Sequence, residues 1–496
     1  MNRLRRTIPL YFINLACIVV NILIILTATL YPFNFSIPDN FSLAEFFSSF
    51  NNASSFSDQV NNILLFMPFG YCCAHLLYKL KVKSWLQLGL IIFLSASLSL
   101  TVETLQIFLA SRFPTPADIF NNTFGGCLGF ICFYVWNYQS FYHTFLEPVE
   151  ENNSRNSKKQ ITGFILTYLF LTLLISLIWQ STINLSNWDL NYPLIIGNER
   201  TGNKPWQGYI SELYIADKAI SNYQVSKGLN DSNYLKKLGD SLLTNYDFKG
   251  KCCYQEQTGN LPELLWKGTT KEVKDHKGVF LDSSQWLQTV GSAKNLSQRI
   301  SETSEFTLSA TIATDKLKQG GPARIISISA DSLLRNLTLS QNGNSLDFRL
   351  RTPLTGQNGA DLQLNIPNVF TDKEFHQIMI TYSRGTIQVY VDEIKNSYSF
   401  KLLELIPKEH KIVYYTLTFI PLGVGLTILN LLTQNQLIFS RFITFVGILL
   451  PSLFLEIMLV VESEKSFSRK NLLLGILVTA GTILVLKIRA SRVKAK

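Results

Sequence analysis

The sequence predicts a multidomain protein in which an α-helical membrane bundle of about eight transmembrane helices carries an all-β sandwich. Two observations predict this class. Of the 496 residues, 47% are hydrophobic and only 16% are charged, which is less charge than a soluble domain normally has. Both ends of the chain are apolar, whereas residues from about 181 to 410 have the composition of a soluble domain.

Eight segments are long and apolar enough to cross a bilayer, which takes about 20 residues. The first follows a basic start, as a secretory signal would. Its apolar region is too long for a signal peptide and no small-residue cleavage pattern follows, so we expect a retained anchor. The predicted spans are roughly 8–30, 59–79, 85–109, 118–140, 161–180, 411–433, 437–461 and 470–488.

Basic residues predict the orientation of the spans, because Lys and Arg collect in cytoplasmic loops. With eight spans, four basic groups fall on one side, and the loop 31–57 on the other side has no Lys or Arg. One loop disagrees, since Lys465, Arg469 and Lys470 would lie outside. We expect both termini in the cytoplasm and the sandwich to be extracytoplasmic. The four groups are Arg3, Arg5 and Arg6; Lys79, Lys81 and Lys83; Arg155, Lys158 and Lys159; and Lys487, Arg489, Arg492, Lys494 and Lys496.

Composition argues against several classes of site. The net charge of +10 is accounted for by cytoplasmic loops, so we predict no nucleic-acid partner. Five of the seven cysteines lie in apolar runs, where Cys behaves as a small hydrophobic residue. Cys252 and Cys253 are adjacent, and neither a disulfide framework nor a metal-ligand spacing is present. We expect no metal and no cofactor.

Polar residues recur at one expected depth of the membrane. The pattern Asp-x-x-Asn-Asn occurs at 58–62 and at 118–122, each time at the head of an apolar run. The predicted orientation brings both copies, and the polar residues between them, to the outer face, where ionisable groups commonly mark a site. Spacings of three or four residues put the members of each pair on one helix face. The candidate site is Asp58, Asn62, Glu103, Gln106, Arg112, Asp118 and Asn122.

A purely structural role accounts for part of this pattern. Asp caps helix starts and Asn hydrogen-bonds between helices. Glu103 is different, because it lies inside an apolar helix and needs a partner, for which Arg112 is the natural candidate.

Three further features bear on the membrane helices. Gly125, Gly126 and Gly129 predict close helix packing. Pro68 and Gly70 predict a break or a kink in the second span. For Glu456, near the outer end of the seventh span, we favour contact with lipid headgroups over membership of the candidate site.

Several motifs follow one another in order: Thr29-Leu30-Tyr31-Pro32-Phe33, Asp58-x-x-x-Asn62 followed by Pro68-Phe69-Gly70, Glu103-x-x-Gln106, and Arg112 followed by Asp118-x-x-x-Asn122-x-x-Gly125. This series resembles the VanZ-like family of bacterial membrane proteins over about residues 10–140. The resemblance implies a four-helix domain in the bacterial cytoplasmic membrane. Because the family name derives from a teicoplanin-resistance protein, it also implies a link to the cell envelope, but no agreed reaction or catalytic residues.

The middle of the chain reads as short strands. Residues 304–314 alternate, and 335–351 form two alternating runs around an Asn-Gly turn. Residues 376–392 form a second hairpin that turns at Arg384-Gly385. Together with Tyr246-Asp247-Phe248, these strands resemble concanavalin A-like or laminin-G-like jelly rolls. Residues 190–216 look like the closing strands of such a domain, yet they come first. We therefore predict a circularly permuted sandwich in which 190–216 pairs with strands from 245–400.

Exposed aromatic residues of the sandwich could hold a carbohydrate, but we favour burial for Trp206 and Trp286. The predicted domains are a VanZ-like four-helix domain at 1–145, a cytoplasmic linker at 146–160, a transmembrane helix at 161–180, the sandwich at 181–408, and three transmembrane helices with a basic tail at 409–496.

Three functions stay open at this stage. The leading one is a non-enzymatic envelope protein in the lipid bilayer, whose sandwich binds a glycan or an envelope protein. The alternative is an enzyme for a lipid-linked envelope precursor, with Glu103 or Asp118 as acid or base and Arg112 as anion clamp. A transporter is the third, although no inverted repeat or broken-helix pair is evident.

Overall fold

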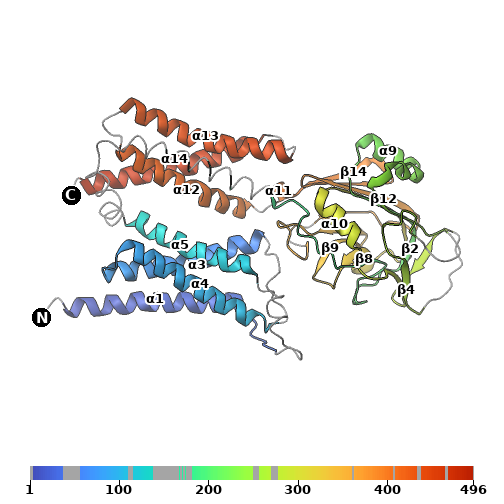
Figure 1. Cartoon of the computed structure of the whole chain (residues 1–496), viewed down its shortest axis with the longest axis horizontal. Coiled ribbons are helices and arrows are strands. Elements are labelled where there is room, and N and C mark those ends of the chain that lie inside the picture. The colour runs from blue at the N-terminus through green and yellow to red at the C-terminus, as the bar shows by residue number, and fades with distance from the viewer. Residues whose placement is uncertain are drawn as a thin grey trace. The chain divides into compact units, whose positions relative to one another are not determined.

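The computed structural model describes residues 4–36, 56–109, 115–137, 181–249, 256–269, 277–359, 364–405, 408–432, 437–463 and 467–494, with single positions between them. These residues form two compact units, one made of helices from both ends of the chain and one made mostly of strands from the middle (Figure 1).

The helical unit contains seven helices that are long and apolar enough to cross a membrane. They agree with seven of the eight predicted spans; the eighth, at 161–180, lies outside the described residues except for single positions. The helices are α1 (Leu4–Leu30), α3 (Phe56–Lys79), α4 (Ser84–Gln106), α5 (Pro116–Trp136), α12 (Lys408–Leu432), α13 (Leu437–Ser463) and α14 (Arg469–Lys494).

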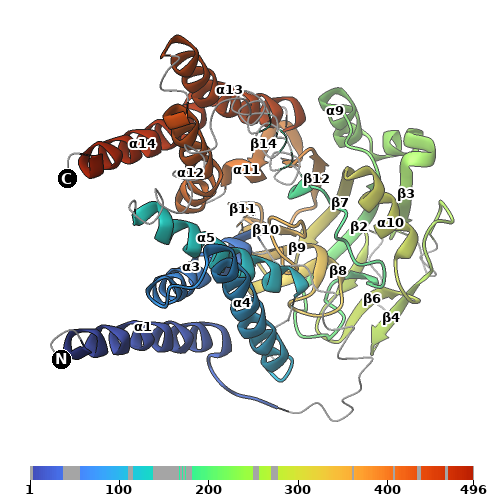
Figure 2. The same cartoon turned by 60° about the vertical axis from the view of Figure 1, so that its left-hand side comes forward.

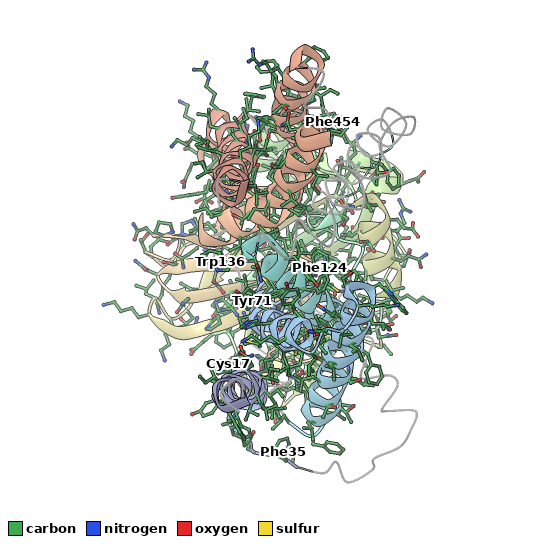
Figure 3. All side chains as sticks on the ribbon, turned by 90° about the vertical axis from the view of Figure 1, so that its left-hand side faces the viewer. Cys17, Phe35, Tyr71, Phe124, Trp136 and Phe454 are labelled. Atoms are coloured by element: carbon green, nitrogen blue, oxygen red, sulfur yellow. The ribbon has the colours of Figure 1, made fainter. Side chains whose placement is uncertain are left out.

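Large apolar side chains cover the outside of these helices. Phe93 of α4 is 67% exposed, and Phe120 and Trp136 of α5 are 72% and 68% exposed. Figure 3 shows the side chains along the helices, among them Phe124 and Trp136 of α5. Apolar exposure on this scale is unfavourable in water and suits a lipid environment.

Helices α3 and α5 run parallel and pack through glycines. A Cβ added at Gly125 would lie 2.3 Å from the carbonyl oxygen of Ile63, and one at Gly129 would lie 2.1 Å from that of Met67. From one contact to the next, the residue numbers increase along both helices, so both helices start at the same end. The predicted close packing is confirmed. Of the predicted break or kink at Pro68 and Gly70, the break is excluded, because α3 continues through both residues, and the kink stays a prediction.

The strand unit consists of two antiparallel sheets of seven strands each, one ordered β11-β10-β9-β8-β1-β6-β4 and the other β14-β13-β12-β7-β2-β3 with β5 beside β2 (Figure 2). The strands are β1 (Leu194–Ile196), β2 (Gly208–Ala216), β3 (Leu242–Asp247), β4 (Leu264–Gly268), β5 (Val279–Leu281), β6 (Gln285–Thr289), β7 (Phe306–Thr314), β8 (Gln319–Ser329), β9 (Arg335–Gly343), β10 (Ser345–Leu350), β11 (Leu364–Ile366), β12 (His376–Ser383), β13 (Thr386–Val391) and β14 (Glu393–Lys401). Two short helices lie between strands, α9 (Asn222–Asn230) and α10 (Lys294–Thr303), and α11 (Leu402–Leu405) follows β14.

Both predicted hairpins are present. β9 and β10 meet beside Gly343, and β12 and β13 turn at Arg384 and Gly385, which both have positive φ. The predicted pairing of 190–216 is confirmed, since β1 lies between β6 and β8 and β2 lies between β3 and β7. That the order arose by circular permutation stays a prediction.

The core of the sandwich lies between its sheets, where the rings of Phe306 and Phe348 approach to 6.5 Å. Trp206 is fully buried as predicted, whereas Trp286 is only partly buried. The chain enters and leaves the sandwich at one hairpin. The Tyr382 hydroxyl donates to the carbonyl of Ile183, and the N–H of Leu402 donates to the carbonyl of Gly385 at 2.9 Å.

Candidate functional site

A buried glutamate of α4 holds the start of α5. Glu103 is 2% exposed, and its Oε2 accepts a hydrogen bond of 3.0 Å from the backbone N–H of Thr115. Thr115 is the N-cap of α5, because its Oγ1 accepts a 3.2 Å hydrogen bond from the N–H of Asp118. The carboxylate also faces the positive end of the helix dipole. Glu103 therefore ties the end of one helix to the start of the next.

Gln106, near the end of α4, connects this site to α1. Its side chain is 8% exposed, and its Nε2 donates a 3.0 Å hydrogen bond to the carbonyl of Thr29. Just beyond, the segments that follow α1 and α4 form an antiparallel bridge between Phe35 and Leu109. Three helices therefore meet at one end of the unit.

The first turns of α5 add an amide and a second carboxylate. Asn122 is 1% exposed, and its Nδ2 donates a 2.9 Å hydrogen bond to Oγ of Ser99. Its buried Oδ1 accepts no hydrogen bond from any described residue. Asp118 is half-buried and interacts electrostatically with Glu103. We call Glu103, Gln106, Asp118 and Asn122 the polar cluster.

The other three predicted site residues differ in placement. The two Asp-x-x-Asn-Asn motifs do lie at the same end, since α3 and α5 are parallel. However, Asp58 is exposed and Asn62 only half-buried. Arg112, with its expected contact to Glu103, lies outside the described residues; in the described part of the chain, the backbone of Thr115 is the hydrogen-bond partner of that glutamate.

Residues 15–137 match the model of the VanZ/LLP1 family. This stretch is a VanZ/LLP1 domain. No curated protein and no solved structure matches the chain. The VanZ/LLP1 domain includes every member of the polar cluster, and together with the seven apolar helices it indicates a multi-pass membrane protein.

Sequence reasoning missed two members of the site in the VanZ/LLP1 domain. Thr115 supplies the N–H that Glu103 binds, and Thr followed by Pro before an acidic residue is a helix-start signal. Ser99 stands four residues before Glu103, on the same helix face, and receives the amide of Asn122.

The preference for Glu456 at the lipid headgroups is wrong. This side chain is 1% exposed, and its Oε1 accepts a 2.6 Å hydrogen bond from the backbone N–H of Ser468. A buried carboxylate with a backbone partner is held inside the helical unit, because snorkelling would require it to reach water.

A second concentration of charge lies in the sandwich, on β8, β9 and β10. We call Arg324, Arg335 and Arg349 the arginine cluster. Arg324 is 1% exposed and donates a 2.8 Å hydrogen bond to Oγ of Ser340, and Arg349 pairs with Asp347 at 3.1 Å.

Arg335 stands apart within the arginine cluster. It is 1% exposed, and none of its guanidinium nitrogens hydrogen-bonds to a described residue. Burial, with the neighbouring arginines, lowers the pKa of Arg335 to about 9, so it remains charged at neutral pH. A buried charge without hydrogen bonds is strongly unfavourable, and the nearby carboxylates of Glu199 and Asp347 favour the charged form of Arg335.

Proposed function

We propose that this protein is a non-enzymatic membrane protein of the bacterial cell envelope, with a polar site at the outer membrane face and an external sandwich that binds an envelope glycan. The observation that carries the first part is the convergence of Glu103, Gln106 and Asn122 from helices of one VanZ/LLP1 domain. Polar side chains held at one end of an apolar helix bundle suit recognition at the membrane surface.

The basic loops support the outward placement of this end. Arg3 precedes α1, Arg5 and Arg6 lie at its start, and Lys81 and Lys83 join α3 to α4, at the end opposite the polar cluster. Basic loops lie in the cytoplasm, so the polar cluster would face outward.

The arginine cluster supports a glycan that carries phosphate or carboxylate groups. Arg335 offers a forked donor with no hydrogen-bond partner among the described residues, and a guanidinium can bind these anions in a bidentate manner.

Binding to cell-wall sacculi tests the sandwich part. We expect the full-length protein in nanodiscs to co-sediment with purified sacculi, and Arg335→Gln to weaken this binding about tenfold, as expected for loss of a charged hydrogen bond. Lys395→Gln, which removes an exposed positive charge from β14, is the matched control and should bind like the parent. Equal binding by both variants, or none by the parent, would refute the glycan role.

Teicoplanin susceptibility tests the polar site. We expect cells that express the full chain to tolerate more teicoplanin than cells without it, and Asp118→Asn to remove this difference. No difference between expressing and empty cells would overturn the proposal for the membrane part.

An enzyme acting on a lipid-linked envelope precursor is the second candidate. The observation in its favour is the electrostatic interaction between the carboxylates of Glu103 and Asp118, since paired carboxylates can share acid and base roles. If expression of the parent chain changes the precursor pools, and expression of the Asp118→Asn variant does not, the result would favour the enzyme over a binding protein.

A further inference from the structure

The three C-terminal helices repeat a contact of the VanZ/LLP1 domain. Near the end of α13, Glu456 accepts a hydrogen bond from the N–H of Ser468, 12 residues further on. Ser468 precedes α14, and its Oγ accepts a 3.4 Å hydrogen bond from the N–H of Asn471. The contact from Glu103 to Thr115 also spans 12 residues and also ends on the capping residue of the next helix.

One constant shift relates the two sets. Ser468 follows Thr115 by 353 residues (468 less 115), and Glu456 follows Glu103 by the same number (456 less 103). The same shift carries Ser84, where α4 begins, to Leu437, where α13 begins. It also carries the start of α5 to the start of α14, and the end of α3 to the end of α12. The helices and both connections therefore match without an insertion or deletion.

The helix packing follows the same shift. A Cβ at Gly70 would lie 2.1 Å from the carbonyl oxygen of Gly126, and a Cβ at Gly423 would lie 3.0 Å from that of Thr479. Unrelated helix pairs would have no reason to share this register. Identical residues at this shift are Val60 and Val413, Leu64 and Leu417, Phe66 and Phe419, Pro68 and Pro421, Gly70 and Gly423, Leu76 and Leu429, Ser99 and Ser452, Leu100 and Leu453, and Glu103 and Glu456.

We infer that α12–α14 is a second, diverged copy of α3–α5, which has kept the glutamate that positions the next helix and has lost the polar residues around it. By order along the chain, the predicted span at 161–180 takes the place of α1, and the sandwich stands where the first copy has its loop between α1 and α3.

The differences between the copies separate two kinds of residue. Most of the polar positions of the candidate site in the VanZ/LLP1 domain carry a different type of side chain in the second copy. The pairs are Asp58 and Lys411, Asn62 and Tyr415, Gln106 and Leu459, Asp118 and Asn471, and Asn122 and Gly475. By contrast, the glutamate, its capping hydroxyl and the serine four residues before it recur. Glu103 and Glu456 are therefore positioning residues, and the residues that contact a ligand belong to the first copy.

Paired variants of the full-length protein test the positioning role. Replacing Glu456 or Glu103 with Ala removes the acceptor, and we expect each melting temperature to fall by roughly 5 °C. Replacing either with Gln keeps an acceptor oxygen and should restore most of the loss. A Glu456→Ala protein that melts like the parent, or a Gln variant no better than Ala, would overturn the inference.

Exchanging residues between the copies tests the division of roles, and this arm rests on the proposed function. Gln106→Leu and Asp118→Asn give the first copy the residues of the second, and should leave melting within about 2 °C while removing the teicoplanin effect. The mirrored changes Leu459→Gln and Asn471→Asp should leave that effect intact. Loss of the effect in the mirrored variants would contradict the division. If the parent shows no effect, the proposed function fails, while the melting arm still decides the positioning role.

Discussion

The two three-helix copies differ most in how closely their middle helix packs. In the VanZ/LLP1 domain, α4 packs closely along α5, and a Cβ added at Gly126 would lie 2.2 Å from Oγ of Ser95. In the second copy the same positions are Thr479 and Ile448, and α13 touches α14 at fewer points. Larger side chains keep the helices apart, although the glutamate contact at the helix end is the same.

The difference shows that the contact at the helix end can form without the tight interface between the helices. A carboxylate accepts a hydrogen bond from the start of the next helix in both copies, whether or not the two helices pack closely. In the first copy, small residues at the interface of α4 and α5 let the amide of Asn122 bind the hydroxyl of Ser99, whereas the amide–hydroxyl pair of the second copy, Asn430 and Thr444, joins α12 to α13. We therefore associate the close packing with the candidate site rather than with assembly in the membrane.

The largest effect is expected from Gly129→Thr, which gives the first copy the residue Thr482 of the second. A Cβ there would lie 2.1 Å from the carbonyl oxygen of Met67, so α3 and α5 must separate at a cost of about 3 kcal/mol or more. Size-exclusion profiles and melting of the full chain would measure this. Gly89→Ala, where nothing lies within 4 Å, is the control and should be neutral. A well-folded Gly129→Thr protein would contradict the tight interface.

Removal of the capping hydroxyls should have an intermediate effect in both copies. Thr115→Ala is expected to cost about 1 kcal/mol, the usual value of an N-cap. Ser468→Ala should cost less, because its hydrogen bond is longer, 3.4 Å against 3.2 Å. Unfolding of each variant in denaturant would give both values, and a larger loss for Ser468→Ala would reverse the comparison.

A double-mutant cycle on Ser99 and Asn122 should show a smaller coupling, about 0.6 kcal/mol, as is typical of hydrogen bonds between membrane helices. The equivalent pair, Ser452 and Gly475, has no amide, so Ser452→Ala should cost less than Ser99→Ala. Additive losses for Ser99 and Asn122 would show that their hydrogen bond contributes nothing.

The smallest effect is expected in the sandwich, outside both membrane copies. A hydrogen bond with Asp392 raises the pKa of His376 above its usual 6.5. This contribution to stability is fully present below the usual pKa and is lost as pH rises through the raised one. We expect the melting of the full chain to fall slightly from pH 6 to pH 8. Asp392→Asn keeps the acceptor for the N–H of Gln377 but removes the charge, so it should weaken the pH dependence and leave the smaller part that comes from Asp372, the other partner of His376.

Patterns with a strong period were predictable from the sequence. Seven helices and both hairpins follow from apolar runs and from turns such as Arg384-Gly385. Side-chain partners were not predictable, because they depend on contacts between helices. Glu103 accepts a hydrogen bond from a backbone N–H, a group that almost every residue type has. Glu456 makes the equivalent contact in the second copy, and its burial follows from that contact. The repeat was not predictable from the sequence, because the two copies share contacts and spacing rather than composition.

The hydrogen bonds from Tyr382 to Ile183 and from Leu402 to Gly385 bring the two ends of the sandwich to one hairpin. The sandwich therefore begins and ends close together, as a short loop does. Such a module can be added or exchanged without separating the two ends of chain to which it is joined. The same closure makes residues 183–402 a natural cassette for replacement by a brief linker.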